Sequence, residues 1–296
     1  MALVCGTFAF HANARRIEQV TFPPIARDLA DQGVRLEGTL VLPPGPAPAG
    51  GRPAIVALHG CGGMYSTSGS GRRQLAERMA LRGDLLVREG YAVLFVDSFR
   101  SRGVREVCTV GRGQRTIKAA QRRLDALAAL AYLASRGDVS RQRIALVGWS
   151  HGGSSALRAV DIGDPAVAAF VARPDAPPFF RAAVAFYPGC AHPLENAQRY
   201  RPGAATRIYI GERDDWTPAA TCVELGKAMA ARGQDLLVTT YADSYHAFDS
   251  PTGEVVHRTD VPNGVHPGKG VHVGPNPAAR EAANASVRAF LRERLH

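Results

Sequence analysis

Lysine is scarce in this sequence of 296 residues, although the formal net charge is +10. The only lysines are Lys118, Lys227 and Lys269, so arginine supplies nearly all of the positive charge. The arginines are scattered among alanines, form no basic run and are not interleaved with aromatic residues that could stack on bases. This distribution predicts no nucleic-acid partner and is typical of solvated surfaces.

Long hydrophobic runs are absent as well. No apolar run reaches the roughly 18–20 residues that a membrane span needs, so the sequence predicts no contact with a membrane. No repeat, linker or low-complexity segment divides the chain, and its content of 46% hydrophobic and 21% charged residues is ordinary. We therefore expect a single domain over residues 15–296. The sequence does not indicate whether the protein is a monomer or an oligomer.

The N-terminus lacks a basic segment, but it has two other features of a secretory signal. The apolar residues 2–10 are followed by Ala12-Asn13-Ala14, which has the small-x-small form of a signal-peptidase site. We interpret residues 1–14 as a signal peptide whose start lies upstream, which predicts a periplasmic or secreted protein. The alternative is a frayed segment or a first strand in a cytoplasmic protein.

Cysteine pairs at zinc-binding C-x-x-C spacing are absent, so the cysteines predict no metal site. Removal of residues 1–14 would take Cys5 with it. An even number of cysteines would remain, as is usual in an oxidising compartment: Cys61, Cys108, Cys190 and Cys222.

Short apolar runs alternate with helical patterns along most of the chain. This alternation predicts an α/β fold with a mainly parallel sheet and helices on both faces. The segment 250–275 has little periodicity and is expected to be irregular. Strands are expected at 34–42, 54–60, 91–97, 143–150, 182–189, 207–212 and 235–243, and helices at 72–89, 118–135, 151–160, 217–232 and 277–295.

Residues 148–152, Gly-Trp-Ser-His-Gly, interrupt this pattern with a polar side chain at the end of a buried strand. They fit G-x-S-x-G between a strand and a helix, which is the nucleophile elbow of the α/β-hydrolases. Such a turn exposes the serine hydroxyl above the sheet, and the helix behind it favours developing negative charge. The pattern predicts that Ser150 is a nucleophile.

A serine nucleophile needs a base, and in this fold the chain order is serine, acid, histidine. His246 lies just after the last predicted strand, where that base belongs. His151 is confined within the elbow. His257, His266 and His272 fall in the irregular segment and are expected at the surface.

The acid should follow the preceding strand, where Asp214 and Asp215 are adjacent. A G-x-x-D spacing from Gly211 favours Asp214, and the other aspartate would then cap the helix near Thr217. Asp215 stays open as the alternative.

An oxyanion hole requires two backbone N–H donors. One is expected from His151, which follows the nucleophile. The other is expected from Cys61 in the glycine-rich segment 59–63. Cys61 could itself be a nucleophile with His59 as base, but their separation by two residues gives poor geometry for that pair.

With these residues placed, the chain resembles the dienelactone hydrolase family. The matching segments span most of residues 54–295 and are LHGCGG, VDSFRSRG, GWSHGG, FYPG, GERDDWTP and YHAFD. The resemblance implies a single-domain α/β-hydrolase that cleaves esters or lactones without metal or organic cofactor. The enzyme that names the family has cysteine in the elbow, where this chain has Ser150. A glutamate that the prototype keeps beside its oxyanion loop is not evident here.

The main prediction is therefore a serine hydrolase that acts on a small-molecule carboxylic ester or lactone through an acyl-enzyme. A peptidase, amidase or acyltransferase could use the same residues, and a non-catalytic binding protein would not need them. Arg100 and Arg102 follow the strand at 91–97 and could bind a substrate carboxylate, unless they belong to a solvated loop. Trp149, inside the elbow, is a further candidate for substrate binding.

Two disulfides are expected from the strand order of this fold. Cys190 and Cys222 follow strands that should be neighbours, as do Cys61 and Cys108. Each pair could therefore meet above the same edge of the sheet. The alternative is four buried free thiols in a cytosolic enzyme.

Overall fold

The computed structural model describes residues 15–27, 32–66 and 74–296. The predicted signal peptide, with Cys5, lies outside these residues. Within them, no helix combines the length and the apolar character required to cross a membrane.

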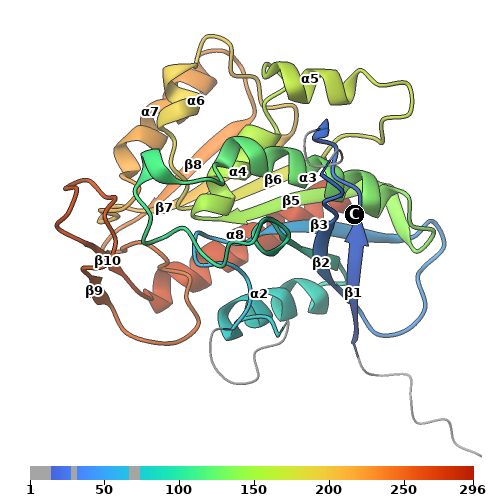
Figure 1. Cartoon of the computed structure of the whole chain (residues 1–296), viewed down its shortest axis with the longest axis horizontal. Helices are drawn as coiled ribbons and strands as arrows, with labels where there is room; N and C mark the ends of the chain where they lie inside the picture. Colours follow the sequence, from blue (N-terminus) through green and yellow to red (C-terminus); the bar gives the residue numbers. More distant parts are fainter. Residues whose placement is uncertain (1–14, 28–31, 67–73) are drawn as a thin grey trace, which may run out of the picture.

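An eight-stranded sheet forms the centre of the molecule (Figure 1). Its strand order is β1-β2-β4-β3-β5-β6-β7-β8. The pairs β1–β2 and β2–β4 are antiparallel, and the strands from β4 to β8 in this order are all parallel. The strands are β1 Arg16–Phe22, β2 Leu36–Leu42, β3 Arg52–Leu58, β4 Ala92–Asp97, β5 Val139–Trp149, β6 Ala182–Phe186, β7 Ala205–Gly211 and β8 Leu236–Tyr241.

The central strands β3, β4 and β6 are buried along their whole length, which explains their continuous apolar sequences. Helices α3, α4 and α5 lie on one face of the sheet, and α2 and α8 lie on the other (Figure 1). The helices are α2 Glu77–Arg88, α3 Ala119–Ala134, α4 His151–Ala159, α5 Pro165–Val171, α6 Ala191–Glu195, α7 Ala219–Ala230 and α8 Pro277–Leu295.

The predicted α/β architecture, with a mainly parallel sheet, is confirmed. The structure adds strand β1 and the short helices α5 and α6, whose sequences carry too few periodic positions to be recognised. It also contains two 3-10 turns in the loops after β4, Arg100–Arg102 and Arg112–Gln114.

The segment 250–275, expected to be irregular, contains a small hairpin of β9 Val256–Arg258 and β10 Val271–Val273. Val273 forms a bridge with His246, and Val271 is fully buried in a hydrophobic cluster with Trp216. Tertiary packing therefore orders a segment whose local sequence has little preference.

Candidate active site

Ser150 lies between β5 and α4, at the carboxyl edge of the parallel strands. Its backbone has φ 55° and ψ −118°, a strained conformation for a residue with a side chain. A Cβ at Gly148 would lie 2.2 Å from the Gly152 oxygen, and one at Gly152 would lie 2.1 Å from the Leu58 oxygen. Both glycines are thus required for the close approach of the helix to the strands.

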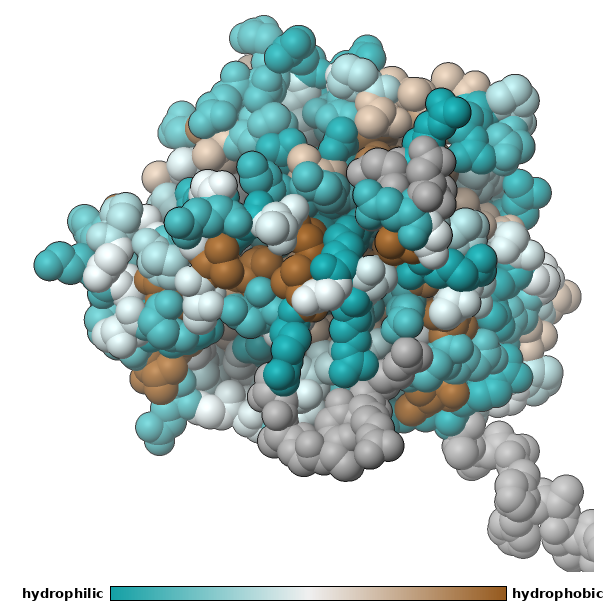
Figure 2. Space-filling model, in the orientation of Figure 1, coloured by the Kyte–Doolittle hydropathy of each residue, from teal (hydrophilic) through white to brown (hydrophobic). Residues whose placement is uncertain are grey.

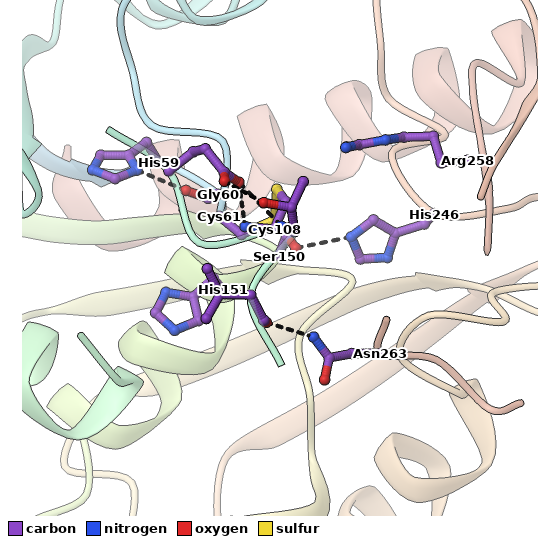
Figure 3. The surroundings of a disulfide bond; sticks show 12 residues. His59, Gly60, Cys61, Cys108, Ser150, His151, His246, Arg258 and Asn263 are labelled. Carbon is purple, nitrogen blue, oxygen red and sulfur yellow. Dashed lines mark hydrogen bonds between the residues drawn. A yellow bond between two sulfur atoms is a disulfide. The ribbon is translucent and has the colours of Figure 1, made fainter. Parts of the chain in front are cut away.

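Ser150, His246 and Asp214 form a continuous chain of hydrogen bonds. The Ser150 Oγ lies 2.8 Å from His246 Nε2, and His246 Nδ1 lies 2.8 Å from Asp214 Oδ2. His246 and Asp214 are buried, whereas Ser150 is half-buried and lines two cavities. Figure 3 shows the imidazole pointing at the serine hydroxyl. In this geometry, His246 Nε2 is placed to accept a proton from the Ser150 hydroxyl.

The two adjacent aspartates of the loop after β7 have different partners. The Asp214 Oδ1 accepts hydrogen bonds from the backbone N–H groups of Trp216 (2.9 Å) and Thr217 (2.8 Å), which leaves Oδ2 directed at His246. Asp215 Oδ2 instead lies 2.7 Å from His272 Nδ1 on β10. Of the two aspartates, it is Asp214 that contacts His246, the histidine hydrogen-bonded to Ser150.

The backbone of Cys61 and His151 flanks Ser150. Among the described residues, neither N–H donates to another backbone or side-chain group. A disulfide joins Cys61 to Cys108 with a Cα–Cα distance of 4.9 Å and lies beside Ser150 (Figure 3). This bond ties the loop after β3 to the loop after β4, so neither cysteine is a free thiol.

Arg122 on α3 contacts both the residue that follows strand β3 and the residue that follows Ser150. Its guanidinium is fully buried, donates to the His59 carbonyl oxygen at 2.7 Å, and lies 2.8 Å from His151 Nδ1. Burial lowers the pKa of Arg122 to about 9. Burial and the Arg122 charge lower the pKa values of His59 and His151 well below the usual range. Both imidazoles are therefore neutral at pH 7.

A second buried network lies on the other side of the elbow. Asp249 accepts hydrogen bonds from Arg82 (2.9 Å), from the indole N–H of Trp149 (2.9 Å) and from the hydroxyl of Tyr187 (2.7 Å). The Tyr187 ring packs 4.6 Å from the His246 ring. Trp149, a candidate for substrate binding, is thus buried and held by Asp249, while part of it still lines the smaller cavity.

Two cavities meet at Ser150. The smaller, about 100 Å³, is bounded by the glycines at positions 60, 62 and 63 in the loop after β3, by Tyr187 and by His246. The larger, about 330 Å³, extends over His151, Ser154 and the start of α7. Figure 2 shows a recess with hydrophobic side chains near the middle of the face drawn there, bordered by hydrophilic side chains.

The two arginines after β4 do not reach Ser150. Arg102 donates to both carboxylate oxygens of Asp125, at 2.9 and 2.7 Å, and to the Ser98 carbonyl oxygen. Arg100 stacks over the Tyr65 ring and lines a separate open cavity of about 1080 Å³. Neither lines a cavity that contains Ser150.

The disulfide between Cys190 and Cys222 is also present, with a Cα–Cα distance of 5.0 Å. It joins the starts of α6 and α7 and lies next to the larger cavity, which Cys190 lines. Of the three histidines in the segment 250–275, His257 and His272 stack on each other in the β9–β10 hairpin, and His266 is exposed.

The sequence analysis missed Thr217, Arg122, Arg82 and the role of Asp249. The Thr217 hydroxyl contacts both Asp214 Oδ2 (3.0 Å) and His246 Nδ1 (3.2 Å). Arg82 occurs on a helix face that is otherwise apolar, and Arg122 occurs on one that is apolar apart from Asp125. A charged residue on such a face was the available signal for a buried charge. No pattern in the sequence indicated that Arg82 would pair with Asp249, or that Arg122 would contact His59 and His151.

The described residues contain no cluster of three or more His, Cys, Asp or Glu side chains suited to a metal ion.

Together, the mainly parallel sheet and the strand–Ser150–helix elbow define the class of the protein as an α/β-hydrolase. The model of the dienelactone hydrolase family matches residues 36–295. The chain therefore belongs to the dienelactone hydrolase family and is a hydrolase.

Solved structures share this fold at low sequence identity. A dienelactone hydrolase from Anabaena variabilis is 16% identical, with a TM-score of 0.59 over 95% of this chain and 99% of that one. A dienelactone hydrolase-like promiscuous phosphotriesterase from metagenomic libraries is 17% identical, with a TM-score of 0.61 over 96% and 100%. A thermophilic esterase from Thermogutta terrifontis is 17% identical, with a TM-score of 0.61 over 93% of each chain. No curated protein sequence matches the chain.

Proposed function

We propose that this hydrolase cleaves carboxylic esters or lactones with Ser150 as the nucleophile. The observation that carries the proposal is the chain of 2.8 Å contacts from Ser150 through His246 to Asp214. Family membership and the similarity to an esterase fold agree with it. The same residues could act on amides, but no contact in the site favours an amide over an ester.

In the proposed mechanism, His246 Nε2 takes the Ser150 proton as Oγ attacks the substrate carbonyl carbon. Asp214 holds the imidazole by accepting the Nδ1–H and stabilises the imidazolium that forms. The N–H groups of Cys61 and His151 donate to the oxyanion. His246 then gives its proton to the leaving oxygen, and an acyl-enzyme remains. Water, deprotonated by His246, hydrolyses this ester and restores Ser150.

The direct test is Ser150→Ala, assayed on 4-nitrophenyl esters of increasing chain length and on simple lactones. We expect kcat to fall by about 10⁴-fold or more, because only binding and the oxyanion donors remain. Ser135→Ala, at the exposed end of α3 and away from both cavities, is the matched control. A fluorophosphonate probe should label the wild-type protein and the control but not Ser150→Ala. A Ser150→Ala protein that retains a tenth of the activity would contradict the assignment.

We also propose that the protein functions in an oxidising compartment, in the periplasm or outside the cell. The two disulfides support this location, because disulfides persist mainly outside the cytoplasm. Thiol titration of the denatured protein, purified from the periplasm, tests it. We expect no reactive thiol from these four cysteines, and four free thiols would contradict the proposal.

A further inference from the structure

The larger cavity at Ser150 is lined by four cationic side chains. Arg112 and Arg115 come from the loop before α3, Lys118 precedes that helix, and Arg158 comes from α4. None of the described residues that line this cavity is acidic. Its wall therefore carries a surplus of positive charge directly beside the hydroxyl of the proposed nucleophile.

These four cations lack ion-pair partners within the described part of the chain, and three of the nearby carboxylates are engaged elsewhere. Asp164 binds Arg123, and Asp125 binds Arg102. Glu106 accepts hydrogen bonds from the backbone N–H of Cys108 and from Thr109. Glu106 acts on Arg115, and Asp161, Asp164 and Glu195 act on Arg158, only through space. The positive charge in the cavity is thus partly offset but is not neutralised by any direct ion pair among the described residues.

Burial and like charge act on the two inner cations. Burial and the neighbouring Arg112 charge lower the pKa of Arg115, and burial and the Arg123 charge lower that of Arg158. Both side chains are only partly exposed, whereas Arg112 and Lys118 are exposed. An anion in the cavity would relieve this repulsion and gain charge-assisted hydrogen bonds.

The smaller cavity differs, because two of its three arginines already have carboxylate partners, and only the exposed Arg78 has none among the described residues. Arg82 is bound to Asp249, and Arg258 is bound to Asp260. The volume of about 330 Å³ in the larger cavity also suits a substrate group, whereas about 100 Å³ suits only a short chain.

We propose that the larger cavity binds an anionic group, a carboxylate or a phosphate, on an ester substrate whose carbonyl lies at Ser150. Arg115 and Arg158 are the inner contacts, and Arg112 and Lys118 attract the anion at the rim. This inference rests on the proposed function, and it assigns anion selectivity to residues other than Arg100 and Arg102.

Two pairs of substrates test the inference, and each pair compares an anionic ester with a neutral ester of similar size. 4-Nitrophenyl hydrogen glutarate and 4-nitrophenyl pentanoate place the charge on the acyl side. 4-Acetoxybenzoate and its methyl ester place it on the alcohol side. We expect at least one pair to show about tenfold higher kcat/KM for the anionic ester at low salt, decreasing at high salt.

Arg115→Gln and Arg158→Gln should each lower the ratio of anionic to neutral kcat/KM at least fivefold. The ratio cancels any general loss of folded enzyme. Arg173→Gln, on the exposed segment after α5, is the control and should leave the ratio unchanged. Equal rates for both members of each pair, or a preference that survives both substitutions, would overturn the inference.

Calorimetry with inorganic phosphate and glutarate separates this inference from the proposed function. The Ser150→Ala protein should bind at least one of these anions, and Arg158→Gln should weaken the binding about tenfold. A protein that binds the anion through Arg158 but hydrolyses no ester would support the anion site and overturn the hydrolysis of esters. A protein that hydrolyses neutral and anionic esters equally and binds neither anion would support the esterase and overturn the anion site.

Discussion

At the scale of single residues, the loop after β7 gives two neighbouring aspartates opposite environments. Asp214 is buried and directed at His246, whereas Asp215 is half-buried and bound to His272. The backbone N–H groups of Trp216 and Thr217 hold the Asp214 carboxylate in place. The two carboxylates should therefore contribute very differently to catalysis.

Asp214→Asn should lower kcat by about 10³–10⁴-fold, because an amide cannot hold the imidazole in the tautomer that accepts the Ser150 proton. Asp215→Asn removes a similar charge from the same loop and should cost less than about tenfold. Steady-state kinetics on one ester compares them. The reverse order of the two variants would move the acid to Asp215.

Arg122 contacts the His59 carbonyl oxygen and the side chain of His151. We therefore propose that it is a positioning residue for the two backbone donors of the proposed oxyanion hole. Arg122→Met should lower kcat about tenfold or more with little change in KM, since the donors are displaced but the cavities remain. Activity should be normalised to sites labelled by a fluorophosphonate. Arg123→Met, which breaks the ion pair between α3 and Asp164 at the start of α5, is the control. Unchanged kcat per labelled site would limit Arg122 to a structural role.

At the scale of elements, the disulfides connect loops that the sheet alone would leave separate. Cys190–Cys222 links the starts of α6 and α7 across 32 residues, and Cys61–Cys108 links two loops across 47 residues. Both bonds lie at the carboxyl edge of the sheet, beside Ser150 or the larger cavity. They restrain the segments from which the site is built.

The double variant Cys190→Ser/Cys222→Ser should lower the free energy of unfolding by about 3–4 kcal/mol in the chain-entropy account of loop closure. Urea denaturation at constant pH measures the change. The wild-type protein, measured in the same series, is the control. A double variant as stable as this control would mean that the bond contributes no net stability.

At the scale of the whole molecule, two neutral histidines couple stability to pH. His59 has one ring nitrogen 2.7 Å from the Gly60 oxygen and the other 3.4 Å from the Ser98 N–H. The pKa values of His59 and His151 are lowered in the folded state, so the unfolded chain binds more protons at acidic pH. Stability is therefore full above the unfolded pKa of about 6.5 and decreases as the pH falls below it.

His151→Gln should reduce this dependence by up to about 1.4 kcal/mol per pH unit between pH 6 and pH 5, because one proton is no longer taken up on unfolding. Urea denaturation across pH 5–8 gives the slope. His266→Gln, at an exposed position, should leave it unchanged. Equal slopes in wild type and His151→Gln would show that His151 does not resist protonation in the folded protein.

The sequence by itself determined the class of fold and the positions of Ser150 and His246. These depend on local patterns: apolar runs of strand length, glycines on both sides of a serine, and a histidine just after the last strand. The sequence also indicated both disulfides, because strand order fixes which loop starts are neighbours. Such features survive in the sequence because each is set within a few residues or by the order of elements.

Only the tertiary structure decided which side chains meet across the chain. The spacing from Gly211 favoured Asp214 but left Asp215 open, and the two differ in the structure because Asp214 faces His246 whereas Asp215 binds His272 of the β9–β10 hairpin. Arg82 and Asp249 lie 167 residues apart, and their pairing appears only when α2 packs beside the loop after β8. The cationic cavity likewise combines residues of α4 with the loop before α3. Contacts of this kind depend on three-dimensional packing, which local periodicity does not encode.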